Sequence, residues 1–442
     1  MQRNIEKDLI NWKNQKNRMP LLLRGARQVG KTFIVEKFGK EQFEDFISIN
    51  FEKEPDYKNC FKALDPTSII NSIELLNKKS IREGKTLLFL DEIQECPKAI
   101  MALRYFKEQM PNLHIIGAGS LLEFVLNDED FRMPVGRVGF MYLRPMSFGE
   151  YLTATDNQKL RNYLKSLHIK DNIDEVIHER LILLVREYFA LGGMPAVINQ
   201  YLDTKSLLQC QDIQNAILLG FKKDFGKYAK KMPHKYLEQI FSKAPGLIGK
   251  WLKYKTLDPD INYRTLKNAL NKLSDAGLII LVHATSAAGL PFITHKNEKK
   301  CKMLFLDIGL AKRACSLGLE VLFKEDLLLV NNGALAEQFV GQELLANIIK
   351  DELNGLYSWV REKKNSSAEI DYLISVGSKI IPIEVKAGAI GKLRSLHIFL
   401  EEKKSPLGIR ISQKPFSYND KILSIPFYLI EEIPRLVKEI LK

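Results

Sequence analysis

The sequence predicts a multidomain α/β protein whose first domain is a parallel sheet flanked by helices. Three observations lead to this fold class. A glycine-bounded loop at residues 25–32 follows a short apolar run, a second apolar run at residues 86–90 ends in two carboxylates, and strand patterns with further carboxylates recur at residues 368–386. The length of 442 residues suits two to four domains at about 100–200 residues each.

The loop at residues 25–32 reads GARQVGKT and matches the pattern GxxxxGK[ST]. The apolar residues 20–24 predict a strand before it, and residues 33–38 predict a helix after it, which is the context that this pattern requires. Glycines let backbone N–H groups approach phosphates, and the helix offers them its positive N-terminus. We expect Lys31 to reach the β- and γ-phosphates of ATP and the Thr32 hydroxyl to bind Mg²⁺. The predicted nucleotide-binding residues of this loop are Gly25, Ala26, Arg27, Gln28, Val29, Gly30, Lys31 and Thr32.

The second motif follows an unbroken apolar run at residues 86–90, which is typical of a strand buried on both faces of a parallel sheet. Asp91 and Glu92 come directly after it. Buried carboxylates are costly unless they serve a cation or a proton transfer. We expect Asp91 to bind Mg²⁺ and Glu92 to polarise the attacking water as a general base. The alternative is an exposed acidic turn after a core strand.

Two further residues are candidates for the same site. Residues 113–117 predict another strand, and Ser120 after it is expected to face the γ-phosphate, although it could instead cap the next helix. Arg137 follows a glycine after the fourth predicted helix and is a candidate arginine finger. It would act on the ATP of its own chain or on that of a neighbour in a homo-oligomer. A surface arginine is the alternative.

The composition is that of an ordinary globular protein, with 45% hydrophobic residues. The net charge of +13 favours polyanionic partners without proving one. Residues 1–18 lack the apolar core of a signal peptide, and no apolar run approaches the roughly 18–20 residues that span a bilayer. The five cysteines are scattered, which fits reduced thiols. We therefore expect a cytoplasmic protein without a membrane partner.

Several segments resemble an AAA-type ATPase family of bacteria and archaea whose members usually carry a C-terminal domain of unknown function. In the first half these segments are GARQVGKT, FLDEIQECP, GAGSLLEF, PVGRVGFMYLRPMSFGEYL and YFALGGMPAVI. In the second half they are FGKYAKK, LDIGLA, GALAEQFVGQEL, EIDYLI and PIEVKAG. The resemblance implies an ATP-hydrolysing core over residues 1–150 and a helical lid over residues 151–232. It also implies that Arg137 acts between subunits or as a nucleotide sensor.

Residues 233–320 predict helices followed by a strand pair, in the shape of a winged helix. A helix is predicted from residues 262–270 onward, and Gly277 ends it. Residues 278–282 follow as a strand. Helices of this kind read the DNA major groove in many proteins. The side chains that would do so here are Arg264, Lys267, Asn268 and Lys272. A domain of the same shape used only for packing or protein contact is the alternative.

Residues 321–442 predict a nuclease-like α/β domain. Residues 333–345 are expected to form a helix, and residues 368–375 and 379–386 are expected to form two strands. Strand alternation places Glu384 and Lys386 on one face.

An aspartate on one strand and Glu-x-Lys on the next resemble the PD-(D/E)XK nuclease superfamily, although Ile370 stands where a proline usually precedes the aspartate. The resemblance implies that Asp371, Glu384 and Glu337 bind a metal and that Lys386 is the catalytic lysine. The alternative is a binding or assembly module in which these charges form a salt-bridged cluster.

The sequence therefore predicts a Mg²⁺-dependent ATPase whose nucleotide state controls a nuclease-like, DNA-interacting C-terminal domain. The alternative is a non-nucleolytic ATPase switch that regulates assembly or partner binding.

Overall fold

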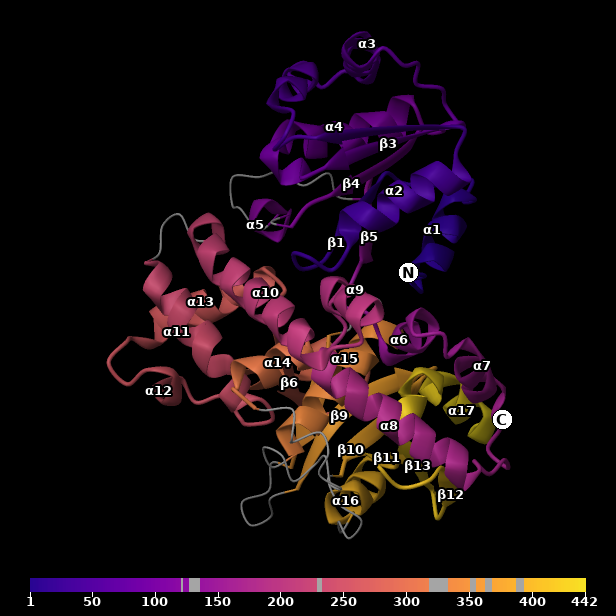
Figure 1. Cartoon of the computed structure of the whole chain (residues 1–442). Coiled ribbons are helices and arrows are strands. Elements are labelled where there is room, and N and C mark those ends of the chain that lie inside the picture. Colours follow the sequence, from indigo (N-terminus) through magenta and orange to yellow (C-terminus); the bar gives the residue numbers. More distant parts are fainter. Residues whose placement is uncertain are drawn as a thin grey trace. The chain divides into compact units, whose positions relative to one another are not determined.

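The computed structural model describes residues 1–120, 122–126, 136–228, 233–317, 333–349, 355–361, 368–386 and 393–442. The chain forms two compact units (Figure 1). The first holds Gln2–Arg144 and Asp275–Gly277, and the second holds Pro145–Ser274 and Leu278–Lys442. Apart from Asp275–Gly277, the segments 151–232, 233–320 and 321–442, which the sequence predicts as separate domains, contribute to one unit.

The first unit contains a five-stranded sheet in the order β2-β3-β4-β1-β5, and each strand pairs in parallel with its neighbours. This confirms the parallel sheet that the apolar runs predict. The strands are β1 Leu21–Arg24, β2 Asp45–Asn50, β3 Thr86–Asp91, β4 His114–Ala118 and β5 Gly139–Tyr142. The helices are α1 Ile5–Lys13, α2 Lys31–Gln42, α3 Pro66–Asn77, α4 Pro97–Gln109 and α5 Leu122–Leu126, with short 3-10 turns η1 Pro55–Phe61 and η2 Ile93–Glu95.

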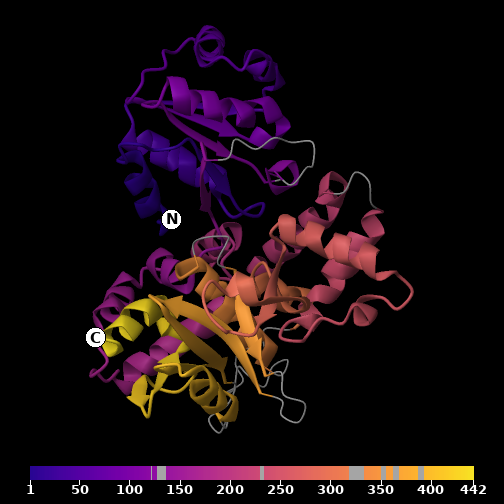
Figure 2. The same ribbon diagram turned by 180° about the vertical axis from the view of Figure 1, so that it is seen from behind.

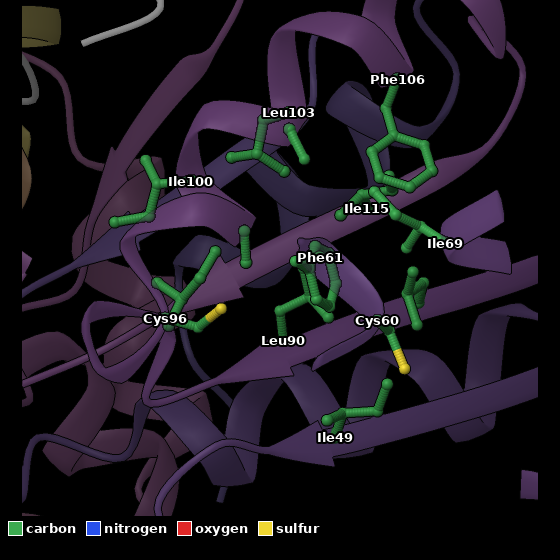
Figure 3. Close-up of a cluster of buried hydrophobic side chains, with 14 of the residues drawn as sticks. Ile49, Cys60, Phe61, Ile69, Leu90, Cys96, Ile100, Leu103, Phe106 and Ile115 are labelled. Carbon is green, nitrogen blue, oxygen red and sulfur yellow. The ribbon is translucent and has the colours of Figure 1, made fainter. Parts of the chain in front are cut away.

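A hydrophobic cluster between α3, α4 and the sheet fixes strand β3 of this unit. Leu90 of β3 packs with Ile49 of β2 and Ile115 of β4, while Leu103 and Phe106 of α4 cover them (Figure 3). Each of these side chains is at most 2% exposed, and burying one contributes roughly 1.5–3 kcal/mol. The cluster therefore holds the end of β3, where the acidic pair lies, in a fixed place.

The strand register brings the ends of the first-unit strands to one edge of the sheet. Asp91 at the end of β3 pairs with Asn50 of β2 and Ala118 of β4, and Ala118 pairs with Leu23 of β1. The loop after β1, the acidic pair after β3 and the residues after β4 therefore meet there. Ligands of open parallel sheets bind at this carboxyl edge.

The second unit combines helices with a mixed sheet. Its helices are α6 Phe148–Ala154, α7 Gln158–Ser166, α8 Glu175–Leu191, α9 Pro195–Thr204, α10 Leu207–Tyr228, α11 His234–Lys243, α12 Tyr254–Leu257, α13 Tyr263–Asp275, α14 Ile308–Ala314, α15 Ala334–Asn347, α16 Arg394–Lys403 and α17 Ile433–Ile440. The helices predicted around residues 262–270 and 333–345 are thereby confirmed as α13 and α15.

The sheet of the second unit has eight strands in the order β12-β13-β11-β10-β9-β8-β6-β7. Its strands from the C-terminal part of the chain are drawn in orange to yellow in Figure 2. Its strands are β6 Ile279–Thr285, β7 Lys296–Phe305, β8 Tyr357–Val360, β9 Glu369–Val376, β10 Lys379–Val385, β11 Gly408–Ser412, β12 Ser417–Asn419 and β13 Ile422–Pro426. The strand pair predicted as a wing, β6 and β7, joins the C-terminal strands because β6 pairs in parallel with β8. The C-terminal domain is thus a mixed sheet, and neither the winged helix nor the nuclease-like fold is confirmed.

A buried polar network connects the helices of the second unit. Asp307, before α14, accepts hydrogen bonds from the backbone N–H groups of Gly193 at 2.6 Å and Leu310 at 3.0 Å. On α15, Glu343 accepts a hydrogen bond from the N–H of Phe148 at 2.9 Å. Burial raises the pKa of Asp307 to about 6 and that of Glu343 to about 8. These contacts connect the turn before α9 to α14, and the start of α6 to α15.

Among the described residues, no single helix is long and apolar enough to cross a membrane. The helices Glu175–Leu191 and Pro195–Thr204 meet the length and composition criteria only together, and the chain bends by 117° between them.

Candidate functional site

The loop between β1 and α2 adopts a conformation that requires glycine at its start. Gly25 has a φ of 138°, and a Cβ atom there would lie 2.1 Å from the backbone oxygen of Leu143. Gln28 and Gly30 also have positive φ values, of 66° and 96°. Strained backbone of this kind clusters at ligand clamps. The loop leads directly into the N-terminus of α2, where unpaired N–H groups favour a phosphate.

Lys31 lies folded into this loop. Its Nζ atom donates hydrogen bonds to the carbonyl oxygens of Gly25 and Ala26, both at 2.8 Å. Burial lowers the pKa of Lys31 to about 8, although the nearby charges of Glu92 and Asp91 oppose the shift. The ammonium is thus held where phosphate oxygens could replace the two carbonyls as its partners.

Thr32, Asp91 and Asn50 form a hydrogen-bonded group beside the lysine. The Oδ2 atom of Asp91 accepts hydrogen bonds from Thr32 Oγ1 at 3.1 Å and from Asn50 Nδ2 at 3.0 Å. Burial, together with the charge of Glu92, raises the pKa of Asp91. A buried carboxylate and a hydroxyl are hard oxygen donors, which suits Mg²⁺ that is also bound by substrate phosphates. The predicted pair Thr32 and Asp91 is therefore brought together in a way that fits this ion.

Glu92 points its carboxylate across to the end of β4. Its Oε2 atom accepts hydrogen bonds from Gln94 Nε2 at 2.7 Å and from the N–H and hydroxyl of Ser120, both at 3.4 Å. The structure therefore places the predicted Ser120 beside Glu92. Asn50 and Gln94 were missed by the sequence analysis, although a polar residue at a strand end and a glutamine two positions after Glu92 were signals that could have found them.

A second charged pair lies at this edge and was also missed. Arg24, the last residue of β1, forms a two-pronged ion pair with Glu123 of α5, and both side chains are 11% exposed. The guanidinium also lies over the ring of Phe140, 5.3 Å from its centroid. The charge of Glu123 is among those that raise the pKa of Lys31. The pair therefore joins the strand before the phosphate loop to the helix after Ser120.

Arg137 lies away from these residues within the chain. It precedes Gly139, which pairs with Leu21 at the start of β1, whereas the phosphate loop follows the end of that strand. Its Nε atom donates a hydrogen bond to Glu108 at 3.1 Å, and the side chain is 47% exposed. A role for Arg137 at the nucleotide of its own chain is thus not supported by the geometry.

The C-terminal residues implied by the nuclease resemblance do converge. Asp371 of β9 accepts a hydrogen bond from the N–H of Val385 at 2.9 Å, and Lys386 donates to Oε1 of the neighbouring Glu384. Burial raises the pKa of Glu337 to about 8 and that of Glu384 to about 7, and the charge of Asp371 adds to both shifts. These values fit carboxylates that share a small buried volume.

A buried lysine occupies this cluster. Lys302 of β7 places its Nζ atom 2.6 Å from Glu369, 3.3 Å from Glu337 and 3.4 Å from Asp371, and its side chain is 3% exposed. Although burial by itself lowers the pKa of Lys302, these three carboxylates raise it above its ordinary value.

The metal site implied for Asp371, Glu384 and Glu337 is therefore not supported. Within the described part of the chain, no group of three or more His, Cys, Asp or Glu residues is arranged to hold a metal ion. The physical reason is that the ammonium of Lys302 already supplies positive charge among the carboxylates. Lys302 lies about 70 residues before Asp371, on a strand that the sequence pattern places in another domain, so its part in this cluster could not be predicted.

Three segments of the chain match known families. Residues 17–152 match the family described as AAA domain. Residues 182–320 match a domain of unknown function, DUF8612, and residues 332–429 match another, DUF4143.

Proteins that match larger parts of the chain have low sequence identity to it. An uncharacterized protein of Methanocaldococcus jannaschii, MJ1637, is 25% identical over 426 residues, which cover 92% of this chain and 83% of that protein. The Walker-type ATPase PABY2304 of Pyrococcus abyssi is 15% identical, with a TM-score of 0.45 over 70% of this chain and 94% of that one. The ORC2 protein of Aeropyrum pernix, in its ADPNP-ADP complexes, is 12% identical, with a TM-score of 0.32 over 59% of this chain and 80% of that one.

The family match and the geometry of the loop, the acidic pair and the parallel sheet agree. Residues 17–152 form an ATP-binding AAA-type P-loop ATPase domain.

Proposed function

We propose that the protein hydrolyses Mg²⁺-bound ATP at the carboxyl edge of the first-unit sheet. The observation that carries the proposal is the hydrogen bond between Thr32 and Asp91, at 3.1 Å, beside the buried Lys31 and next to Glu92. These four residues come from the end of one strand, β3, and the start of one helix, α2, and each has the chemistry that phosphoryl transfer needs.

Each residue has a defined task in this proposal. Lys31 exchanges the carbonyls of Gly25 and Ala26 for phosphate oxygens and stabilises the charge that develops on them. Thr32 and Asp91 hold Mg²⁺, which supplies further neutralising charge when it is bound. Glu92 accepts a hydrogen bond from the attacking water and draws its proton away.

Replacing Lys31 by alanine tests the phosphate site. K31A should bind a fluorescent ATP analogue about 10- to 100-fold more weakly, because a charged hydrogen-bond donor to the phosphates is lost. Lys40 lies exposed on the same helix, α2, so K40A is the matched control and should bind normally. Unchanged ATP binding and hydrolysis by K31A would contradict the proposal.

We further propose that the nucleotide state controls the second unit as a binding module. The observation that favours binding over cleavage is Lys302, whose ammonium pairs with Asp371 and Glu337, two of the carboxylates that a metal-dependent nuclease would need. A nuclease-like fold stays a proposal, supported by Asp371 and Glu384 on adjacent antiparallel strands. The helical lid over residues 151–232 stays a prediction as well.

DNA is the proposed partner of this module. The net charge of +13 favours a polyanion, and Arg264 and Asn268 are exposed on α13. DNA binding, measured by fluorescence anisotropy, should differ between the ATP and ADP states and weaken in the doubly substituted R264A/N268A protein. Plasmid incubated with Mg²⁺ or Mn²⁺ should stay intact. Cleavage that D371A abolishes would instead establish the nuclease.

A further inference from the structure

We infer that Gln94 is a positioning residue for Glu92 in ATP hydrolysis. The inference rests on the proposed function, because it concerns the side chain that would activate water. It starts from an unusual pair. Glu92 precedes the 3-10 turn η2 and Gln94 lies within it, and Gln94 Nε2 donates to Glu92 Oε2 at 2.7 Å across only two positions of the chain.

The backbone around η2 explains how the two side chains meet. Glu92 precedes this 3-10 turn in a left-handed conformation with a φ of 47°. Such a conformation is uncommon for residues other than glycine, and it persists only where the surroundings determine it. The chain therefore accepts local strain at Glu92, and the result is a carboxylate that lies beside the Gln94 amide.

Gly119, after β4, leaves the space that the Gln94 amide occupies. A Cβ atom at Gly119 would lie 1.9 Å from Gln94 Oε1 and 3.0 Å from its Cδ. The next residue, Ser120, contributes the other two hydrogen bonds to Glu92 Oε2. The ends of two neighbouring strands thus cooperate to hold one carboxylate oxygen.

A buried amide oxygen without a hydrogen-bond partner among the described residues indicates that Gln94 has a role beyond packing. Its side chain is buried, and within the described ranges its Oε1 atom has no hydrogen-bond partner. The amide cannot be turned to relieve this, because only its NH₂ group can donate to the carboxylate. An unpaired buried oxygen is unfavourable, so a side chain that only filled space here would be better apolar.

The contact defines how Glu92 can act on water. Three hydrogen bonds converge on Oε2, and none to Oε1 is present among the described residues. Fixing one oxygen orients the other, which becomes the acceptor for the attacking water. A carboxylate held in one rotamer reacts faster than one that must find its geometry.

Four variants test the assignment. Q94L removes the donor with little change in size, and Q94E replaces the donor by an acceptor of the same shape. G119A pushes the amide away from its place. Gln109 is exposed at the end of α4, so Q109L is the matched control. For each protein kcat, KM, the affinity for a fluorescent ATP analogue and the melting temperature are measured.

We expect kcat to fall about 10- to 100-fold in Q94L, Q94E and G119A, as for a lost orienting hydrogen bond, while nucleotide affinity stays close to that of the wild type. Q109L should match the wild type. In single-turnover measurements the doubly substituted E92Q/Q94L protein should be within about twofold of E92Q, because Gln94 acts through Glu92. A merely structural glutamine would leave kcat unchanged or lower affinity and kcat together.

The inference is overturned if Q94E, which keeps the shape of the side chain, hydrolyses ATP at the wild-type rate. It is also overturned if Q94L slows E92Q by the same factor as it slows the wild type. The proposed function fails separately, if the wild type releases no phosphate from ATP or E92Q is as active as the wild type.

Discussion

At the scale of single residues, the nucleotide site and the C-terminal cluster each contain side chains that are buried despite their charge. Lys31, Asp91 and Glu384 are each less than 10% exposed, and burial shifts the pKa of each toward its neutral form. A phosphate would restore the charge of Lys31, and a cation that of Asp91. Shifts of this kind cluster at functional sites, although buried structural networks produce them too.

Glu343 belongs to such a structural network and predicts a pH dependence of stability. Its folded-state pKa of about 8 lies above the unfolded value. The folded protein therefore keeps a proton that the unfolded chain loses, and the free energy of unfolding falls as pH rises from about 4.5 to 8. Asp307 and Glu337 are shifted in the same direction.

E343Q keeps the acceptor for the Phe148 N–H and removes the titration. We expect its melting temperature to fall less than that of the wild type between pH 5 and 8.5, as followed by circular dichroism. Glu401 is exposed on α16, so E401Q should behave as the wild type. If the melting temperature of E343Q falls as much as that of the wild type over this pH range, Glu343 does not hold its proton in the folded state.

At the scale of elements, much of the fold follows from local patterns. The loop from β1 to α2, the buried strand β3, and the strands carrying Asp371 and Glu384 were predicted correctly because each has its own apolar run. Long-range pairing has no such local signal. The parallel pairing of β6 with β8 joins residues more than 70 positions apart, which is why the pair β6 and β7 was predicted as a separate wing.

Lys302 shows the consequence of that pairing for a site. It links β7 to carboxylates on α15 and β9. K302M should destabilise the protein by about 3–5 kcal/mol, because it leaves buried carboxylates without a counter-charge. It should also create a site for a divalent cation, so Mn²⁺ should raise the melting temperature of K302M but not that of the wild type.

Lys299 provides the control for this experiment, since it is exposed on the same strand. K299M should melt as the wild type does, with or without Mn²⁺. Equal stabilisation of the wild type by Mn²⁺ would mean that the cluster accepts a metal beside Lys302. A metal-dependent nuclease would then be the better interpretation of the cluster.

At the scale of the whole molecule, an AAA-type ATPase domain is joined to a second unit that combines two segments from families of unknown function. The sequence predicts that Lys31, Thr32, Asp91, Glu92 and Ser120 belong to one nucleotide site, and these residues meet at one edge of the sheet. It could not place Gln94 or Asn50, whose roles depend on contacts between strands. Nor could spacing alone show that Arg137 lies at the opposite edge of its own sheet.

The position of Arg137 leads to a prediction about assembly. Because its own nucleotide edge is out of reach, an arginine finger here would need the ATP of a second copy. R137A and K31A should each hydrolyse ATP poorly, and mixing them should partly restore phosphate release. Arg104 also pairs with Glu108, at 3.2 Å, so R104A is the control and should stay active. Wild-type activity of R137A alone would leave Arg137 as a surface residue.

The central claim is that Glu92 activates water for ATP hydrolysis, and the most direct measurement is phosphate release by E92Q under saturating ATP and Mg²⁺. We expect a fall of at least about 100-fold, as for the loss of a general base, while ATP binding is kept. Glu95 is exposed three positions later, so E95Q should retain wild-type turnover. Undiminished phosphate release by E92Q would contradict the account.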